Sequence, residues 1–446
     1  MIINVAGAGA GKTTQLADKI INKYNEMCNN KNIYCITFTN NAASCIEKKL
    51  IEHFVKIPDS IKVSTIHSFL YQEIIKPYYF LLYQKHFDVV SSIILPDKPQ
   101  FKNWKIKQLE NSNILHITAF TEKAKWILVK KSSDRKKEKD IRCAILKAFS
   151  QYCNMIFIDE AQDIDVNLVE ILKQLDKHGI EIEIMGDPKQ DLKGFDSFRK
   201  LMESYSKHIN FINDCHRCPQ NHLDLSNSII PKEEWQVSSK KFGEIKVIFE
   251  KELDDIESMV ASDFDLKYIS QQNDRYDTHG ELDFSVKFDS LFYELKDILA
   301  ELSTDKNELR IKKLAYYYAS KLIDKYRKTQ NLEKSIKETI VFIKGNKKAY
   351  ARIINALKFN EISKASRIPV DSIERVKGQE GNNCLFIVTT DLATYLFHEK
   401  KDNNRTKNKL YVALTRSLEK LTLLITKEVE DKYGKEFICA HFKEYL

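Results

Sequence analysis

Short apolar runs alternate with stretches of helical spacing along the first third of the chain. The runs have the length and composition of buried strands, and they lie at residues 2–6, 33–38, 62–65 and 155–158. Between the first two runs, apolar residues recur every three or four positions at Leu16, Ile20, Tyr24 and Met27, which predicts a helix with one buried face. Strands that alternate with helices are typical of a parallel sheet covered by crossover helices. The pattern therefore predicts an α/β fold.

Two segments interrupt this alternation. Residues 75–150 and 285–362 are mostly helical in pattern and rich in lysine, and strand-like runs return at 385–389 and 421–426. We therefore predict two α/β domains with parallel sheets, each interrupted by a mostly helical insertion. The first domain takes residues 1–74 and 151–209 with its insertion at 75–150, and the second takes 210–284 and 363–446 with its insertion at 285–362.

Composition narrows the class of protein. With 446 residues, of which 43% are hydrophobic and 30% charged, the chain can bury more than one core. No apolar run approaches the roughly 18 to 20 residues of a membrane span, and the start lacks the basic residues and cleavage site of a secretory signal. Nine scattered cysteines favour reduced thiols in a cytoplasmic protein over a disulfide framework. The net charge of +8 is compatible with a polyanionic partner.

The stretch AGAGAGKT at residues 6–13 carries the first candidate chemistry. Small residues between a strand and a helix let backbone N–H groups surround phosphate oxygens, and the helix start adds its positive dipole end. Lys12 would reach the β- and γ-phosphates of a nucleotide, and the Thr13 hydroxyl would ligate Mg²⁺. The alternative is a glycine-rich turn with an exposed lysine. The predicted nucleotide contacts in this loop are Ala8, Gly9, Ala10, Gly11, Lys12, Thr13 and Thr14.

The stretch MIFIDEAQD is the natural counterpart of this loop. Its apolar run places Asp159 and Glu160 at the carboxyl end of a buried strand, where ligands bind in open α/β sheets. Asp159 could hold Mg²⁺, and Glu160 could activate water for attack on the γ-phosphate. An acidic helix start explains the same residues, and both interpretations can hold at once. Together, the two stretches predict a nucleotide hydrolase.

Further motifs follow in a fixed order along the chain. They are ITFTNNAA (36–43), STIHSF (64–69), MGDPKQDL (185–192), NDCHRCP (213–219), ERVKGQEG (374–381) and LYVALTRSLEKL (410–421). With the phosphate loop and DEAQD, this series resembles the superfamily 1 DNA helicases of the UvrD/Rep/PcrA type. The resemblance spans positions 6 to 421 and implies two RecA-like domains with ATP between them. It implies a Mg²⁺-dependent, DNA-stimulated ATP or NTP hydrolase that translocates 3′ to 5′.

The resemblance also implies roles for individual residues. Gln190 matches the residue that senses the γ-phosphate, and Arg217 and Arg416 match the two arginines that reach it from the second domain. A planar arginine fork suits the charge that develops on a transferring phosphoryl group, although ordinary surface charge is the alternative. Gly378 and Glu380 match the motif that meets the γ-phosphate region and the ribose.

For DNA, the resemblance places Phe38 and His67 along a single-strand track, with Phe195 near a base-stacking position. Phe38 is equally well explained as a core aromatic residue. The basic run at residues 130–142 could follow a phosphate backbone or be a solvated face.

The chain departs from the family pattern at several positions. It starts too late to carry the family's adenine-reading Gln, and His216 stands where a base-stacking Tyr is common. Glu374 replaces a His, and Lys193 replaces a Tyr after GDPKQ. We therefore expect poor discrimination between ATP and other NTPs.

Both helical insertions look reduced for this family. A compact chain with this motif set resembles the helicase-like subunits of the Gabija anti-phage system, which work with an OLD-family nuclease that contains a TOPRIM domain. The resemblance implies single-stranded or tailed DNA and such a nuclease as partners. A stand-alone DNA repair helicase, or a nucleotide-binding regulatory subunit with little unwinding, remains the alternative.

Overall fold

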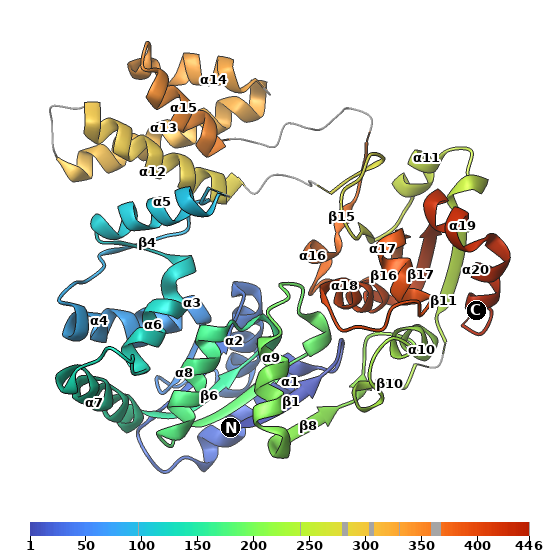
Figure 1. The fold of residues 1–446 in the computed structure, drawn as a ribbon, viewed down its shortest axis with the longest axis horizontal. Helices are drawn as coiled ribbons and strands as arrows, with labels where there is room; N and C mark the ends of the chain where they lie inside the picture. The colour runs from blue at the N-terminus through green and yellow to red at the C-terminus, as the bar shows by residue number, and fades with distance from the viewer. Residues whose placement is uncertain are drawn as a thin grey trace. The chain divides into compact units, whose positions relative to one another are not determined.

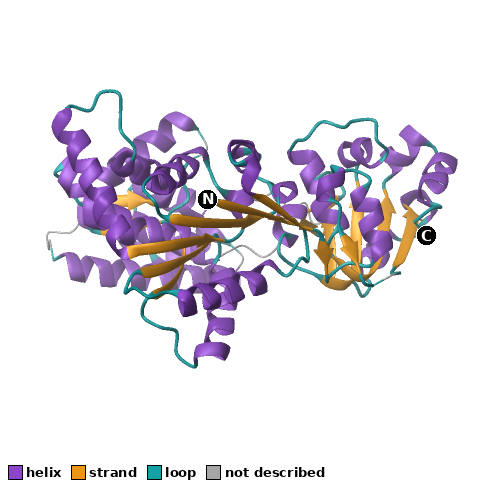
Figure 2. Ribbon diagram, turned by 90° about the horizontal axis from the view of Figure 1, so that it is seen from below, coloured by secondary structure: helices purple, strands orange, loops and turns teal. Residues whose placement is uncertain are grey.

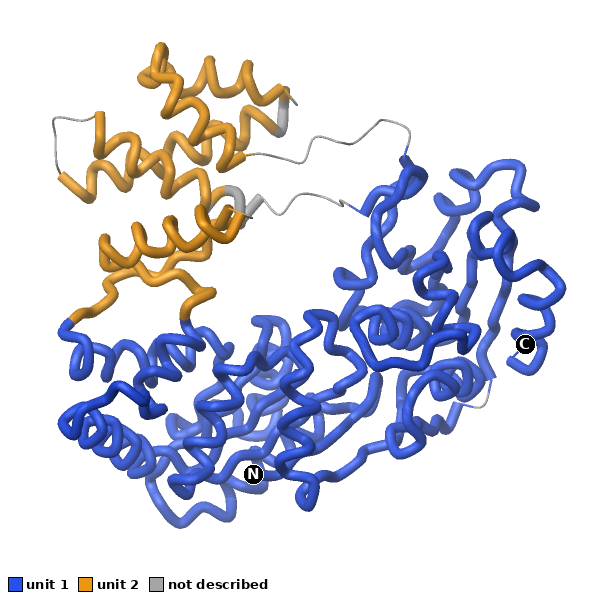
Figure 3. The backbone as a smooth tube through the Cα atoms, viewed as in Figure 1, with its two compact units in different colours: residues 1–84, 120–280, 366–446 blue, residues 85–119, 281–365 orange. Residues whose placement is uncertain are grey.

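The computed structural model describes most of the chain, and its helices and strands are labelled in Figure 1. The described residues are 1–96, 98–240, 242–278, 284–302, 307–329, 331–357 and 367–445. They form two compact units, shown in different colours in Figure 3. Unit 1 comprises residues 1–84, 120–280 and 366–446, and unit 2 comprises residues 85–119 and 281–365.

Unit 1 contains a six-stranded parallel sheet with the order β3-β2-β6-β7-β1-β8. Its strands are β1 (Ile2–Ala6), β2 (Asn32–Thr37), β3 (Ile61–Thr65), β6 (Cys153–Ile158), β7 (Glu181–Gly186) and β8 (Ile209–Ile212). Its helices include α1 (Lys12–Glu26), α2 (Asn40–Phe54), α8 (Val166–Lys177) and α9 (Ser197–Ser204). Leu16 and Ile20 of α1 pack with Ile33 of β2, as the helical spacing predicts. The parallel order brings the carboxyl ends of β1, β6 and β7 to one edge.

Unit 1 also contains a five-stranded parallel sheet with the order β11-β17-β16-β12-β15. The strands of the two sheets form two separate groups in Figure 2, each with helices around it. The five strands are β11 (Glu244–Phe249), β12 (Leu266–Ile269), β15 (Asp371–Ser372), β16 (Gly381–Val388) and β17 (Ser417–Ile425). The nearby helices are α10 (Gln220–Asn227), α11 (Ile256–Ala261), α16 (Ile373–Val376), α17 (Thr390–Leu396), α18 (Arg405–Leu414), α19 (Lys427–Tyr433) and α20 (Lys435–Phe442). Two parallel sheets with helical crossovers confirm the predicted α/β fold class.

Further elements complete unit 1. They are α3 (Ile66–Phe69), the π-helical turn η1 (Leu70–Ile75), α4 (Lys76–Tyr83), α6 (Phe120–Leu128), α7 (Lys136–Tyr152), and the strand pairs β9 (Asp214–Cys215) with β10 (Val237–Ser238) and β13 (Tyr276–Asp277) with β14 (Ile368–Pro369). The 3₁₀ turns are η3 (Ala161–Asp163), η4 (Pro188–Gln190), η5 (Ser206–His208), η6 (Lys232–Glu234) and η7 (Glu250–Glu252). Arg142, which belongs to the basic run at residues 130–142, is buried and forms an ion pair with Asp134 at 2.7 Å. Its charge is therefore neutralised inside the fold.

Unit 2 is mostly helical. It contains β4 (Val89–Ser91), α5 (Pro99–Asn111), β5 (Ile114–His116), η2 (Ile117–Ala119), α12 (Phe284–Leu302), α13 (Glu308–Thr329), α14 (Leu332–Thr339), η8 (Val341–Ile343) and α15 (Lys347–Leu357). Leu295, Ala319 and Ile353 lie in its buried core. Glu294 joins the two chain segments of the unit, because it pairs with Lys105 of α5 and with Arg352 of α15, each at 2.7 Å.

Unit 2 thus combines parts of both predicted insertions, residues 75–150 and 285–362. The four-segment domain division stays a prediction, and its boundary at 362–363 lies outside the described residues. Within the described ranges, none of the helices has the length and apolar content that crossing a membrane requires.

Candidate nucleotide-binding site

The phosphate loop connects β1 to α1, as the sequence predicts. Gly9 and Gly11 both have φ of 71°, a left-handed conformation that glycine adopts without the steric cost of a Cβ. The loop ends at Gly11, and α1 begins at Lys12 with its first N–H groups at the loop. Lys12 Nζ donates hydrogen bonds to the carbonyl oxygens of Ala6 at 3.3 Å and Gly7 at 3.2 Å. The loop therefore places a lysine ammonium group and a helix start together, which suits a phosphate group.

Asp159 follows the carboxyl end of β6 and faces this loop. Thr13 Oγ1 donates to Asp159 Oδ2 at 3.4 Å. Burial, together with the neighbouring Glu160 carboxylate, raises the pKa of Asp159 to about 6, against the opposing effect of Lys12. A hydroxyl and a carboxylate are oxygen ligands of the kind that would hold Mg²⁺, which in nucleotide sites is bound through few protein oxygens. Thr13 and Asp159 are therefore the residues that could hold Mg²⁺.

Glu160 has an unusual backbone conformation. Its φ is 54°, which is uncommon for a residue with a side chain, and its N–H donates to Asp159 Oδ1 at 2.8 Å. The side-chain amide of Gln162 donates to the Glu160 carboxylate. These contacts hold the Glu160 carboxylate beside the candidate Mg²⁺ ligand, where it could accept a proton from water.

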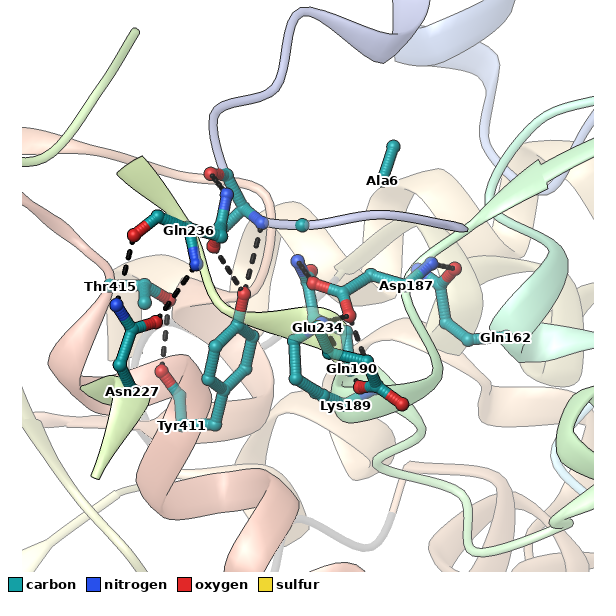
Figure 4. Close-up of polar contacts among 12 residues, drawn as sticks. Ala6, Gln162, Asp187, Lys189, Gln190, Asn227, Glu234, Gln236, Tyr411 and Thr415 are labelled. Atoms are coloured by element: carbon teal, nitrogen blue, oxygen red, sulfur yellow. Dashed lines mark hydrogen bonds and ion pairs between the residues drawn. The ribbon is translucent and has the colours of Figure 1, made fainter. Parts of the chain in front are cut away.

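Gln162 connects the DEAQD and GDPKQ segments. Its Oε1 accepts the N–H of Asp187 at 3.0 Å, and Asp187 Oδ2 in turn accepts from the Gln190 side chain at 2.9 Å (Figure 4). Asp187 is fully buried. Burial alone would raise the pKa of Asp187. The positive charges of Lys189 and Lys12 favour the carboxylate more strongly, so the pKa of Asp187 lies below its ordinary value. Gln190 is thereby fixed by a charged acceptor next to the loop.

Arg416 follows α18 and is fully buried. Its guanidinium donates to Val412 O at 2.9 Å, Gln379 O at 3.0 Å and Thr415 Oγ1 at 3.2 Å. Burial and the nearby Arg217 lower its pKa. Among the described residues, no carboxylate lies within ion-pair distance of Arg416, so its charge is held by neutral acceptors alone.

Arg217 lies beside the phosphate loop. A Cβ at Gly9 would stand 2.4 Å from Arg217 Cβ, so this glycine also permits the close approach of two chain segments. Arg217 Nε donates to Glu380 Oε2 at 2.6 Å, which brings two predicted site residues into one ion pair. The N–H of His216 donates to Gly9 O at 2.9 Å.

Gly378 has φ of 84° in the loop before β16. Beside it, Lys377 Nζ donates to Asp163 Oδ2 of the DEAQD segment at 2.8 Å. The structure thus brings His216 and Arg217 to the phosphate loop, Glu380 to Arg217, and Lys377 to the DEAQD segment. Thr14 is exposed at the start of α1.

Two residues at the loop carried no assignment from sequence. Tyr411 Oη accepts the N–H of Ala8 at 3.1 Å, and Gln236 Nε2 donates to Ala8 O at 2.9 Å (Figure 4). Tyr411 lies inside the YVALTR motif, so its place in that motif was the available signal. Gln236 lies in no recognised motif, and nothing in its sequence context indicates the contact.

The predicted nucleic-acid residues gather around Lys193. Lys193 Nζ lies 5.7 Å from the ring centroids of both Phe38 and Phe195. Burial and the charge of Lys193 lower the pKa of His67, which keeps the imidazole neutral near pH 7. Phe195 is 43% exposed and the Lys193 side chain 51% exposed. The cluster presents aromatic faces and a cation to solvent, an arrangement that suits single-stranded nucleic acid.

Comparison with known proteins gives matches of two kinds. A family model described as an AAA domain matches residues 1–196. Gabija protein GajB of Bacillus cereus (strain VD045) is 31% identical over 202 residues, which cover 43% of this chain and 37% of GajB. The matched part thus spans well under half the length of that relative. The chain resembles UvrD-type superfamily 1 helicases and, within them, GajB, which confirms the resemblance predicted from the motifs.

Among solved structures, the Arterivirus nonstructural protein 10 helicase is similar with a TM-score of 0.37 and 9% identity, over 95% of this chain and 59% of that one. Its complex with DNA is similar with a TM-score of 0.37 and 10% identity, over 95% of this chain and 60% of that one. At these scores the two likenesses carry no argument about this chain.

Replacement of Asp159 by Asn is expected to stabilise the protein at pH 8 in the absence of Mg²⁺ and nucleotide. A carboxyl group whose pKa is raised on folding binds its proton more tightly in the folded state, so ionisation opposes folding. This cost is absent below about pH 4, grows as the pH rises toward about 6 and is largest above it. Thermal melts at pH 8 and pH 5 should show a gain in Tm at pH 8 that shrinks at pH 5. A lower Tm for Asp159→Asn than for the wild type at pH 8 would contradict the raised pKa of Asp159.

Proposed function

We propose that this chain is a Mg²⁺-dependent ATP or NTP hydrolase of the UvrD-like helicase type, stimulated by DNA. The observation that carries the proposal is the buried Arg416, whose charge has only neutral acceptors among the described residues, in the same compact unit as the phosphate loop. A buried cation without a carboxylate partner is costly in a folded protein. An anionic ligand such as a nucleotide phosphate would offset that cost.

The residues divide the hydrolytic work among them. Lys12 and the N–H groups of Gly11 to Thr13 would bind the β- and γ-phosphates. Glu160 would orient the attacking water and accept its proton, and Gln190 would respond to the γ-phosphate. Bound at Thr13 and Asp159, Mg²⁺ would supply positive charge to the phosphate oxygens. Arg217 and Arg416 would stabilise the charge that develops on the transferring group.

We propose that single-stranded DNA, or DNA with a single-stranded tail, binds over Phe38, His67, Phe195 and Lys193. Base stacking on aromatic rings needs no sequence preference, and the Lys193 ammonium can pair with a backbone phosphate. Lys193 also pairs weakly with Asp163 of the DEAQD segment at 3.8 Å. The same side chain therefore links the DNA cluster to the hydrolytic residues. The 3′-to-5′ direction of movement is proposed from the resemblance.

We further propose that the chain acts in the cytoplasm as the helicase-like subunit of a Gabija-like defence complex. The nine cysteines are free, which suits a reducing compartment. In unit 2, lysines and arginines outnumber aspartates and glutamates by eight, which equals the net charge of +8 of the whole chain. Unit 2 also exposes Phe101, Trp104, Tyr316 and Tyr317, each more than half exposed. Exposed aromatic residues with basic neighbours are typical of interaction surfaces, and an OLD-family TOPRIM nuclease is the proposed partner.

Hydrolysis should depend on Mg²⁺ and rise with single-stranded DNA. Lys12→Ala should abolish it by weakening nucleotide binding, because the loop loses its ammonium group. Glu160→Gln should abolish it while nucleotide stays bound, because the amide keeps the shape but cannot accept the proton. Phosphate release and binding of a fluorescent ATP analogue separate these effects. Equal loss of binding in both variants would contradict the roles.

Lys193→Ala tests the proposed DNA site in the same phosphate-release assay. It should raise the DNA concentration that gives half-maximal stimulation, while Lys200→Ala, a change at an exposed lysine on α9, should not. If DNA stimulates both variants equally, the cluster around Lys193 is not part of the DNA-binding site.

Co-expression with a nuclease encoded beside this chain should yield a stable hetero-complex. The expectation rests on the charge and exposed aromatic residues of unit 2, so Trp104→Ala with Phe101→Ala should weaken the complex. Size-exclusion chromatography with mass measurement reads this out. A monomer that unwinds long duplexes processively alone would favour the stand-alone repair helicase. A nucleotide-binding chain without hydrolysis would favour the regulatory subunit.

A further inference from the structure

Both backbone polar groups of Ala8 in the phosphate loop are hydrogen-bonded by side chains from elsewhere in the chain. Its N–H donates to Tyr411 Oη at 3.1 Å. Its carbonyl oxygen accepts from Gln236 Nε2 at 2.9 Å and from the Cys215 thiol at 3.2 Å. Tyr411 Oη donates to Gln236 Oε1 at 2.7 Å, which closes a ring of hydrogen bonds through the N–H and the C=O of Ala8 (Figure 4).

The ring is rigidly supported. The backbone of Gln236 exchanges two hydrogen bonds of 2.9 Å with the side chain of Asn227, the last residue of α10. Gln236 and Tyr411 are each 1% exposed. The fit is also close, because a Cβ at Gly7 would stand 2.2 Å from Gln236 Cδ. Gly7 has no positive φ, so close packing against Gln236, rather than backbone conformation, accounts for the glycine.

Tyr411 ties this ring to Arg416. The carbonyl oxygen of Tyr411 accepts from Thr415 Oγ1 at 2.9 Å, and Thr415 Oγ1 accepts from the Arg416 guanidinium at 3.2 Å. Tyr411 thus links Ala8 to the arginine, through its side-chain hydroxyl at one end and its backbone carbonyl at the other. Displacement of the ring would change the position of Arg416 relative to the phosphate loop.

We infer that Gln236 and Tyr411 are positioning residues for hydrolysis, which act by holding the Ala8 peptide at a fixed distance from Arg416. This inference rests on the proposed NTP hydrolysis and assigns these two residues a role in it. Small misplacement of a charge-stabilising group lowers the rate of the chemical step far more than it lowers affinity. Loss of the ring should therefore slow hydrolysis of bound nucleotide.

The test is a single-turnover measurement with excess protein over radiolabelled ATP, because that rate constant does not depend on the fraction of folded molecules. Gln236→Glu keeps the shape but turns the donor to Ala8 O into an acceptor. Tyr411→Phe removes only the hydroxyl. Each should lower the rate constant about tenfold while nucleotide affinity changes less than about threefold. The double variant should be no slower than the slower single variant, because both break one ring.

Two further variants keep the test decisive if these proteins fold poorly. Gly7→Ala leaves Gln236 and Tyr411 chemically unchanged, but its methyl group should displace the Gln236 amide and reproduce the tenfold loss. Tyr83→Phe is the control, since this tyrosine at the end of α4 donates to Trp126 O of α6 at 2.8 Å, and none of its described contacts involves the ring or Arg416. Its rate constant should stay within about twofold of the wild type.

The pH profile gives an independent signature. A protonated carboxylic acid can donate to Ala8 O as the amide does, so Gln236→Glu should approach the wild-type rate as pH falls toward 6. Wild-type rates in Gln236→Glu, Tyr411→Phe and Gly7→Ala, or losses that multiply in the double variant, would overturn the inference. A wild-type protein that binds no nucleotide would instead overturn the proposed function.

Discussion

The arrangement of the site depends on one loop that two parallel sheets share. The loop leaves the six-stranded sheet at Ala6, and the side chains that satisfy its Ala8 peptide come from Gln236, Tyr411 and Cys215, which lie outside that sheet. Because a buried peptide without partners is costly, these contacts require the segments around both sheets to meet at the loop. The glycines at positions 7 and 9 make the approach possible, since a Cβ at either would collide with Gln236 or Arg217.

Charge organises the rest of the site around this loop. Lys189 is buried between Asp187 at 2.9 Å and Glu234 at 3.3 Å (Figure 4). Arg199 also pairs with Glu234, at 3.0 Å. The two cations and the two carboxylates neutralise one another, so this buried cluster needs no ligand to balance its charge. Arg416 and Asp159 differ, because the pKa of each is shifted against its charged form, chiefly by burial. The site therefore combines a satisfied ionic framework with two charges that a nucleotide and Mg²⁺ would compensate.

The sequence predicted the fold class and the phosphate loop because the signals are local. An apolar run, a glycine-rich turn and a helical pattern follow one another directly, and the structure contains them as β1, the loop and α1. Strand β7 was not predicted, because Glu181 and Glu183 interrupt the continuous apolar run that marks the predicted strands of this sheet. Its buried Glu183 is compensated by Lys19 and by the Asn4 amide, contacts that only the folded chain supplies.

Other features depend on distant parts of the chain. Gln236 and Tyr411 contact Ala8 across 228 and 403 positions, and neither contact leaves a local pattern. Unit 2 likewise joins residues 85–119 to residues 281–365, a pairing that helical spacing cannot indicate. The roles of the site residues carried over from the resemblance stay predictions, although the structure places His216, Arg217 and Glu380 near the loop.

The most direct test of a phosphate site shared by both sheets is the hydrolysis rate of Arg416→Lys with nucleotide bound. Lysine keeps the positive charge but lacks the planar fork, so it cannot reproduce the three hydrogen bonds of the guanidinium. We predict that kcat falls by about 10³ while the fluorescent ATP analogue still binds, as expected for an arginine that acts on the transferring phosphoryl group. Near-normal turnover by a folded Arg416→Lys protein would contradict it.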